Sequence, residues 1–142
     1  MSELTRGNLG WLLAKASQRW NEQLATAFRD AGFPEVRPSF GSVLVPLFEE
    51  DGLRMSELAG RSGLSKQAMT TLVRSVEEAG LVARARDAED GRAFRVSLTA
   101  RGTALRPAAE EVLASLSARV RAPLSESELH TLETSLRKVV EL

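Results

Sequence analysis

The sequence of 142 residues predicts a mainly α-helical protein with one small β-hairpin. Apolar residues recur at spacings of three and four over most of the chain, whereas strand-like alternation is clearest over residues 93–98. With 43% hydrophobic and 27% charged residues, the composition is typical of a globular domain that can bury a core. We therefore expect residues 1–142 to form a single domain.

Two helices are predicted in the first third of the chain. The apolar residues from Leu9 to Phe28 share one helical stripe, and Gly32 suits the left-handed conformation that often ends a helix. A second helix is predicted over Phe40–Phe48. Pro46 lies inside this second helix, where it removes one internal hydrogen bond, so we expect a kink there.

A pair of helices with a tight turn between them is predicted next. The first of them is expected to have Ser56 as its N-cap and to end at Gly63. The second is expected to have Ser65 as its N-cap and to end at Gly80. Because so few residues separate the two helices, their connection must be a tight turn.

The hairpin and two further helices complete the chain. Residues 81–86 and 93–98 flank a polar segment, 87–92, and read as two strands with a charged tip. Apolar stripes then predict helices over residues 105–120 and 129–140. Ser125 and Glu128 have the spacing of a capping box, which marks the start of the last helix.

The helix that follows Ser65 has one apolar face and one polar face. The polar face is rich in groups that bond to base edges and phosphate oxygens, which suits the major groove of DNA. An ordinary solvated helix face is the alternative if this helix is taken alone. The predicted DNA-contacting residues of this helix are Ser65, Lys66, Gln67, Thr70, Thr71 and Arg74.

The order of the elements favours DNA over a solvated face. A short helix, a tight turn and a polar helix place a recognition helix in the major groove, and the hairpin that follows can reach the minor groove with Arg92. An Asp-Gly turn at residues 90–91 with a merely solvated Arg92 is the alternative for the hairpin alone. We predict a winged helix-turn-helix DNA-binding lobe over residues 36–99.

The charge distribution agrees with this lobe. Basic and acidic residues both number 19, so net charge does not indicate a nucleic acid partner. Residues 54–101, however, hold nine basic and six acidic residues, whereas the segments on either side are slightly acidic. This pattern is expected if only the central segment meets a polyanion, although a solvated surface also produces such fluctuations.

The same residues resemble the DNA-binding core of the MarR (multiple antibiotic resistance) regulators, and the order of helices resembles that family over the whole length. The resemblance implies that Arg92 enters the minor groove, that Asp90 braces Arg92 through an ion pair, and that Arg84 belongs to the DNA-binding set. Thr71 stands where an Arg is frequent in the family and Arg74 where an acid is frequent, so base preferences do not carry over. The matching segments are Leu64-Ser65-Lys66-Gln67-Ala68-Met69-Thr70, Glu78-Ala79-Gly80-Leu81-Val82, Asp90-Gly91-Arg92 and Leu98-Thr99-Ala100-Arg101-Gly102.

The terminal segments, 7–32 and 100–142, are predicted to be dimerisation helices. They carry more leucine and alanine than one small lobe can cover, so we expect a symmetric homodimer on a pseudo-palindromic operator. Helices folded over their own lobe are the alternative. The resemblance further implies a repressor that a small-molecule or anionic effector releases from double-stranded DNA. The aromatic residues that either line such an effector site or belong to the core are Trp11, Trp20, Phe28, Phe40 and Phe48.

Other functions find little support in the residues. The chain has no cysteine, and its single histidine, His130, has no catalytic partner, so we expect neither an enzyme nor a cofactor. A calcium loop at Asp87, Glu89 and Asp90 fails because Leu98 holds the closing position that needs Glu. Without a signal peptide or membrane span, a cytoplasmic protein is expected. The remaining alternative is a winged-helix module that binds protein rather than DNA.

Overall fold

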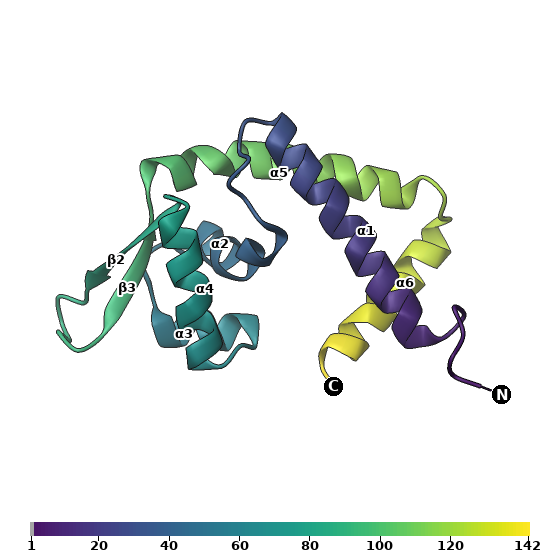
Figure 1. Cartoon of the computed structure of the whole chain (residues 1–142), viewed down its shortest axis with the longest axis horizontal. Coiled ribbons are helices and arrows are strands. Elements are labelled where there is room, and N and C mark those ends of the chain that lie inside the picture. The colour runs from purple at the N-terminus through teal and green to yellow at the C-terminus, as the bar shows by residue number, and fades with distance from the viewer. Residues whose placement is uncertain (1) are drawn as a thin grey trace.

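The computed structural model describes residues 2–142 and forms an arch (Figure 1). Helix α5 forms the top of the arch. One arm below it contains α2, α3, α4 and the sheet, and the other contains α6 and the N-terminal part of α1. This mainly helical fold with one small sheet confirms the predicted fold class. Its elements are α1 (Leu9–Asp30), a 3-10 turn (Pro38–Phe40), α2 (Gly41–Glu49), β1 (Leu53–Arg54), α3 (Met55–Ser62), α4 (Lys66–Glu78), β2 (Val82–Arg86), β3 (Phe94–Leu98), α5 (Ala100–Arg121) and α6 (Glu126–Val140).

Helix α2 contains a buried proline whose effect on hydrogen bonding is compensated by a neighbouring helix. Pro46 has no backbone N–H, so the carbonyl of Ser42, four residues earlier, loses its helical donor. The Ser62 hydroxyl at the end of α3 donates to that carbonyl at 2.5 Å. The Ser42 carbonyl is therefore not left unpaired, and this hydrogen bond connects α2 to α3.

The helix-turn-helix is confirmed, with one correction at its start. The N-cap of α3 is Arg54 and not Ser56, which lies inside the helix. Arg54 is extended because it pairs with β3, and its backbone N–H donates to the Glu57 carboxylate at 3.0 Å. At the turn, Gly63 has a φ of +64°, and the Ser65 hydroxyl accepts a hydrogen bond from the N–H of Ala68, as an N-cap does.

The three strands form an antiparallel sheet in the order β1-β3-β2. The predicted hairpin is β2 and β3, in register from Val82 opposite Leu98 to Arg86 opposite Phe94. Strand β1 was not predicted, because its two residues are too few to show a periodicity. It pairs Leu53 with Val96 and so attaches the start of α3 to the hairpin.

The hairpin packs directly on the start of α5. Thr99 caps α5 by accepting from the Gly102 N–H at 3.1 Å, and its hydroxyl donates to the Gly80 carbonyl at 2.6 Å. A Cβ atom on Gly102 would lie 2.1 Å from the Leu81 carbonyl oxygen, which is far inside van der Waals contact. The Thr and Gly of the Leu-Thr-x-x-Gly segment are therefore needed for the close packing of α5 on the residues that begin the hairpin.

The core lies inside the lobe and along the crossing of α1 with α5. Leu58, Met69, Val73, Leu81 and Val96 are fully buried within the lobe. The buried residues along the crossing of α1 with α5 are Leu24, Phe28, Ala109, Val112 and Leu116. None of the helices in residues 2–142 combines the length and hydropathy that a membrane span requires.

Candidate nucleic-acid interface

Helix α4 has the two faces that the sequence predicts. Met69, Val73 and Val76 are fully buried against the core. The opposite face is open to solvent and gathers the predicted helix residues on one surface. Lys66, Gln67, Thr71 and Arg74 are exposed there, and Thr70 is half-buried at its edge.

The hydroxyl groups on this face are already engaged within the helix. Thr70 Oγ1 donates to the Lys66 carbonyl at 2.8 Å, and Thr71 Oγ1 donates to the Gln67 carbonyl at 3.1 Å. Both threonines therefore present a methyl group and an acceptor oxygen rather than a free donor. The donors that this face offers to a ligand come from the Lys66, Gln67 and Arg74 side chains.

The hairpin tip presents Arg92 to solvent. Asp90 Oδ1 accepts a hydrogen bond from the backbone N–H of Arg92 at 3.0 Å, and the Asp90 carbonyl accepts from Ala93 at 3.0 Å. The expected ion pair between Asp90 and the Arg92 guanidinium is not formed within residues 2–142. The short aspartate side chain turns back onto the loop backbone, as in an Asx turn, which leaves the guanidinium projecting.

Arg84, the remaining predicted contact, lies at the junction of the hairpin and α4. Its Nε and Nη2 atoms are both 3.1 Å from the Glu77 Oε1 atom of α4, and its guanidinium lies near the Phe94 ring. Arg84 thus joins β2 to α4. It is half-buried and already has a carboxylate partner, whereas Arg92 is exposed at the tip and is in no ion pair within the described residues, 2–142.

A buried carboxylate at the base of the hairpin tip was not predicted as a site residue. Asp87 Oδ2 lies 2.7 Å from Arg54 Nε and 3.2 Å from Arg95 Nε, and Oδ1 accepts from the Glu89 N–H at 2.9 Å. These hydrogen bonds and charges hold the pKa of Asp87 below its ordinary value, the Glu89 N–H contributing most, although burial opposes them. Nothing in the sequence pattern connects Asp87 to Arg54, because they are 33 residues apart.

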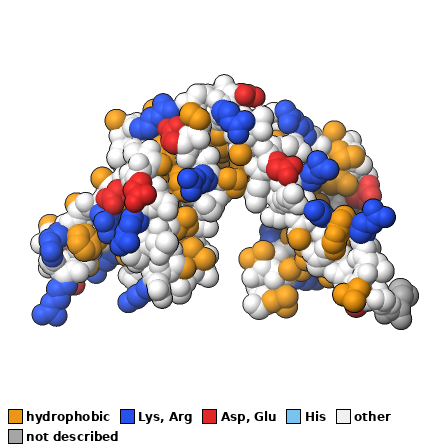
Figure 2. Space-filling view, viewed as in Figure 1, with side chains coloured by type: hydrophobic (Ala, Val, Ile, Leu, Met, Phe, Trp, Pro, Cys, Tyr) orange, Lys and Arg blue, Asp and Glu red, His pale blue; other side chains and the backbone are white. Residues whose placement is uncertain are grey.

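Basic side chains gather on the arm that contains α4 and the hairpin (Figure 2). The acids Glu77 and Asp87 of this arm are paired with arginines, which reduces their effect on an approaching anion. Arg86 Nη1 binds the Gly91 carbonyl at 2.5 Å and adds a further positive charge to the hairpin. The arrangement can bind a polyanion with one helix and one adjacent loop.

An apolar cavity of about 260 Å³ lies between α1, α2 and α5, outside this basic surface. Two of the five candidate aromatics, Phe28 and Phe48, line it, whereas Trp11, Trp20 and Phe40 do not. Its charged lining residues are Arg37, Glu49, Arg106 and Glu110. Arg106 is already bound to the Phe48 carbonyl at 2.7 Å, with Glu110 3.6 Å away.

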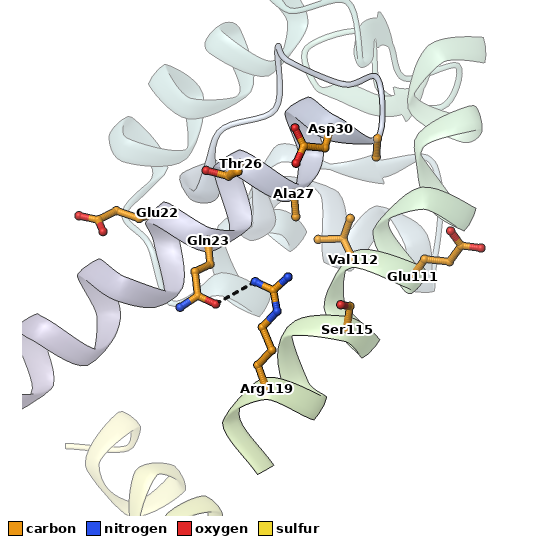
Figure 3. A pocket seen from close by; sticks show the side chains of 10 residues that line it. Glu22, Gln23, Thr26, Ala27, Asp30, Glu111, Val112, Ser115 and Arg119 are labelled. Carbon is orange, nitrogen blue, oxygen red and sulfur yellow. Dashed lines mark hydrogen bonds between the residues drawn. The ribbon is translucent and has the colours of Figure 1, made fainter. Parts of the chain in front are cut away.

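A second hollow, of about 490 Å³, lies in the crossing of α1 with α5 (Figure 3). Gln23 of α1 and Arg119 of α5 reach towards each other across it, and their side chains are hydrogen-bonded at 3.3 Å. Glu22, Asp30 and Glu111 also line it, so carboxylates outnumber its single arginine. This hollow contains no predicted site residue and its charge does not suit DNA.

Comparisons with known proteins agree with this geometry. A model of the MarR family matches residues 38–94, which contain the helix-turn-helix and most of the hairpin. The HTH-type transcriptional repressor Rv2887 of Mycobacterium tuberculosis is 34% identical over 131 residues, 92% of each chain. The structure of Rv2887 in complex with salicylic acid is similar to this chain with a TM-score of 0.62 at 33% identity, covering 92% of this chain and 95% of Rv2887.

A solved complex with DNA is also similar. The transcriptional repressor CouR, bound to a 23-mer DNA duplex, has a TM-score of 0.79 at 26% identity and covers 98% of this chain and 99% of its own. The likeness extends over the terminal helices as well as the winged helix-turn-helix lobe. From the identity to Rv2887 over nearly the whole length of both chains, together with the fold, the chain belongs to the MarR family of transcriptional regulators.

Proposed function

We propose that the protein is a sequence-specific transcriptional repressor that binds double-stranded DNA as a homodimer. One observation carries this proposal: the exposed face of α4 and the Arg92 hairpin lie on one arm of the molecule and are joined by Arg84 and Glu77. Helix α4 would enter a major groove and Arg92 the adjacent minor groove. Similar proteins support the proposal. Rv2887 is described as a transcriptional repressor, and the structure of CouR was determined in complex with a DNA duplex.

The apolar surface of the terminal helices supports the dimer. No residue of α6, which lies wholly within the described residues 2–142, is buried. Helix α6 nevertheless carries a regular apolar stripe. Figure 2 shows hydrophobic side chains over the arm formed by α1 and α6. Exposed apolar residues on α1, α5 and α6 are Leu9, Trp11, Leu12, Leu13, Leu113, Val120, Leu132, Leu136, Val139 and Val140.

A second copy of the chain is the proposed cover for this surface. Leu24 and Phe28 of α1 are buried, but α6 and the N-terminal half of α1 keep their apolar residues exposed, which does not fit helices folded over their own lobe. Residues 7–32 and 100–142 would then form the dimer, and residues 36–99 would form two DNA-binding lobes. A two-fold axis would set the two α4 helices about 34 Å apart, one turn of DNA, on a pseudo-palindromic operator.

The phosphate contacts can be tested by salt titration. We expect the affinity for random duplex DNA to fall as salt rises, because lysines and arginines displace counterions from phosphates. Lys66→Ala should reduce both the affinity and the salt slope, whereas Arg6→Ala, which removes an exposed arginine ahead of α1 and outside both proposed surfaces, should change neither. Salt-independent or absent DNA binding would favour the alternative, a module that binds protein.

The proposed place of action is the cytoplasm.

We also propose that a small aromatic carboxylate acts as the effector in the cavity between α1, α2 and α5. The cavity has an apolar wall with Phe28 and Phe48, and its Arg37 forms no ion pair with a carboxylate within residues 2–142. The salicylic acid bound to Rv2887 is a ligand of this chemistry. An effector can release DNA only if it binds one dimer geometry more tightly than the other.

Salicylate is the probe for this second proposal. It should release operator DNA from the wild type, and Arg37→Ala should require more salicylate while binding DNA normally without it. Arg29→Ala is the matched control, since Arg29 is exposed at the end of α1 and does not line the cavity. Equal salicylate responses of both variants and the wild type would place the effector elsewhere.

A further inference from the structure

We propose that Asp87 is a positioning residue for DNA binding, because it holds the Arg92 loop at a fixed place relative to the helix-turn-helix. The proposal rests on the proposed function, in which Arg92 contacts DNA. Asp87 itself is buried, with 2% of its side chain exposed, so it does not contact DNA directly. It would act through the residues that it binds.

Asp87 connects three parts of the lobe. Oδ2 lies 2.7 Å from Nε of Arg54, the residue that caps α3, and 3.2 Å from Nε of Arg95 on β3. Arg95 also donates to the Gly52 carbonyl at 2.8 Å, just before β1. One carboxylate therefore joins the end of β2 to the opposite strand and to the first residue of the helix-turn-helix.

The backbone of Asp87 closes the tip loop at the same place. Its N–H donates to the Ala93 carbonyl at 2.9 Å, and its Oδ1 accepts from the Glu89 N–H at 2.9 Å. Residues 88–92 are thus held at both ends, and Arg92 is the last residue before the closing hydrogen bond. Displacement of Asp87 would release the segment that carries Arg92.

A second contact of the hairpin with the helix-turn-helix lies in the middle of β2. Arg84 binds Glu77 of α4, while Asp87 binds Arg54 at the start of α3. The hairpin is therefore fixed to both helices of the helix-turn-helix at two separate points. Because a loop already ordered before binding loses less conformational entropy on DNA, this arrangement should increase the contribution of Arg92 to affinity.

The direct test is a double-mutant cycle between Asp87→Asn and Arg92→Ala, measured as operator affinity. Asparagine keeps the shape but removes the charge and sets an amide against two arginines. We expect Arg92→Ala alone to weaken binding roughly five- to 150-fold. Asp87→Asn should approach that loss, and the double variant should bind no more weakly than Arg92→Ala.

The cycle separates this proposal from the proposed function. If Arg92→Ala leaves affinity unchanged, the wing role itself is wrong. If Arg92→Ala weakens binding but Asp87→Asn either does nothing or adds its full loss independently, only the positioning role is overturned. Glu50→Gln is the matched control, because it removes an exposed acid of the same lobe that pairs with Arg61 and not with Arg54 or Arg95.

Two further measurements keep the proposal testable if Asp87→Asn folds poorly. Arg54→Gln and Arg95→Gln each leave Asp87 with one arginine partner, and each should weaken binding through Arg92 in the same cycle. In the free protein, amide hydrogen exchange of Glu89 should become faster in both variants, because its partner carboxylate is less firmly held. Unchanged exchange together with unchanged coupling to Arg92 would overturn the positioning role.

Discussion

Arg84 of β2 and Glu77 of α4 form an ion pair in which two guanidinium nitrogens lie 3.1 Å from one carboxylate oxygen. The pair is about two thirds buried, with exposed side-chain fractions of 30% and 32%. It joins the hairpin to α4 at the point where both are proposed to meet DNA. The resemblance to MarR regulators suggests a direct DNA contact for Arg84, whereas the geometry gives it a partner inside the protein.

Comparison of Arg84→Ala with Glu77→Gln distinguishes these two roles. Each change should lower the free energy of unfolding by about 1 kcal/mol or less, because the pair is partly solvated. If Arg84 acts through Glu77, both variants should lose similar DNA affinity. A much larger loss for Arg84→Ala, measured by fluorescence anisotropy with a labelled operator, would instead indicate a direct contact.

Gly102→Ala should destabilise the protein. The new Cβ would stand 2.1 Å from the Leu81 carbonyl oxygen, so α5 and the hairpin must separate, at a cost of about 1–3 kcal/mol or more. Gly60→Ala is the matched control, since its Cβ position meets no atom within 4 Å beyond the backbone of its own helix, and alanine should be neutral or stabilise α3 by up to about 1 kcal/mol. Urea unfolding of both variants tests this, and equal stability would contradict the close contact.

Ser62→Ala should lower the free energy of unfolding by about 1 kcal/mol, because the Ser42 carbonyl loses its donor. The loss should be smaller in a Pro46→Ala background, where the alanine N–H can bond to the same carbonyl. A double-mutant cycle by urea unfolding measures this coupling. Strict additivity of the two changes would show that Ser62 does not replace the bond that Pro46 removes.

The contribution of Asp87 to stability should persist throughout the neutral range. Its folded pKa is below the ordinary aspartate value of about 3.9. A carboxylate with a lowered pKa stabilises the fold above its unfolded pKa, and this contribution disappears as pH falls through the folded pKa. The stability difference between wild type and Asp87→Asn should therefore stay constant at neutral pH and shrink only below about pH 4. A difference that already declines above pH 5 would contradict the ion pairs with Arg54 and Arg95.

The elements that the sequence predicts well are those with local signals. Gly32, Gly63 and Gly80 all have positive φ where helix ends were expected, and Ser65 and Ser125 cap their helices. These features depend on a few neighbouring residues, so the sequence alone is sufficient to locate them. The exposed face of α4 was predictable for the same reason, because helical periodicity separates its two faces.

The features that were missed depend on distant partners. Strand β1 and the Arg54 cap exist because Leu53 pairs with Val96, 43 residues later. The Asp87 cluster likewise joins residues from three separate segments, and no local pattern identifies it. The error over Asp90 has another cause, since a short side chain can satisfy the loop backbone as readily as a nearby guanidinium.

The central claim is that two copies of this chain bind one duplex through α4 and Arg92. Sedimentation of the protein with a selected, fluorescently labelled operator tests it most directly, because it reports both the number of chains per duplex and the affinity. We predict a dimer in the free protein and two chains per operator, with affinity that falls as salt rises. A monomeric protein, or a complex that is indifferent to salt and to Arg92→Ala, would contradict the account.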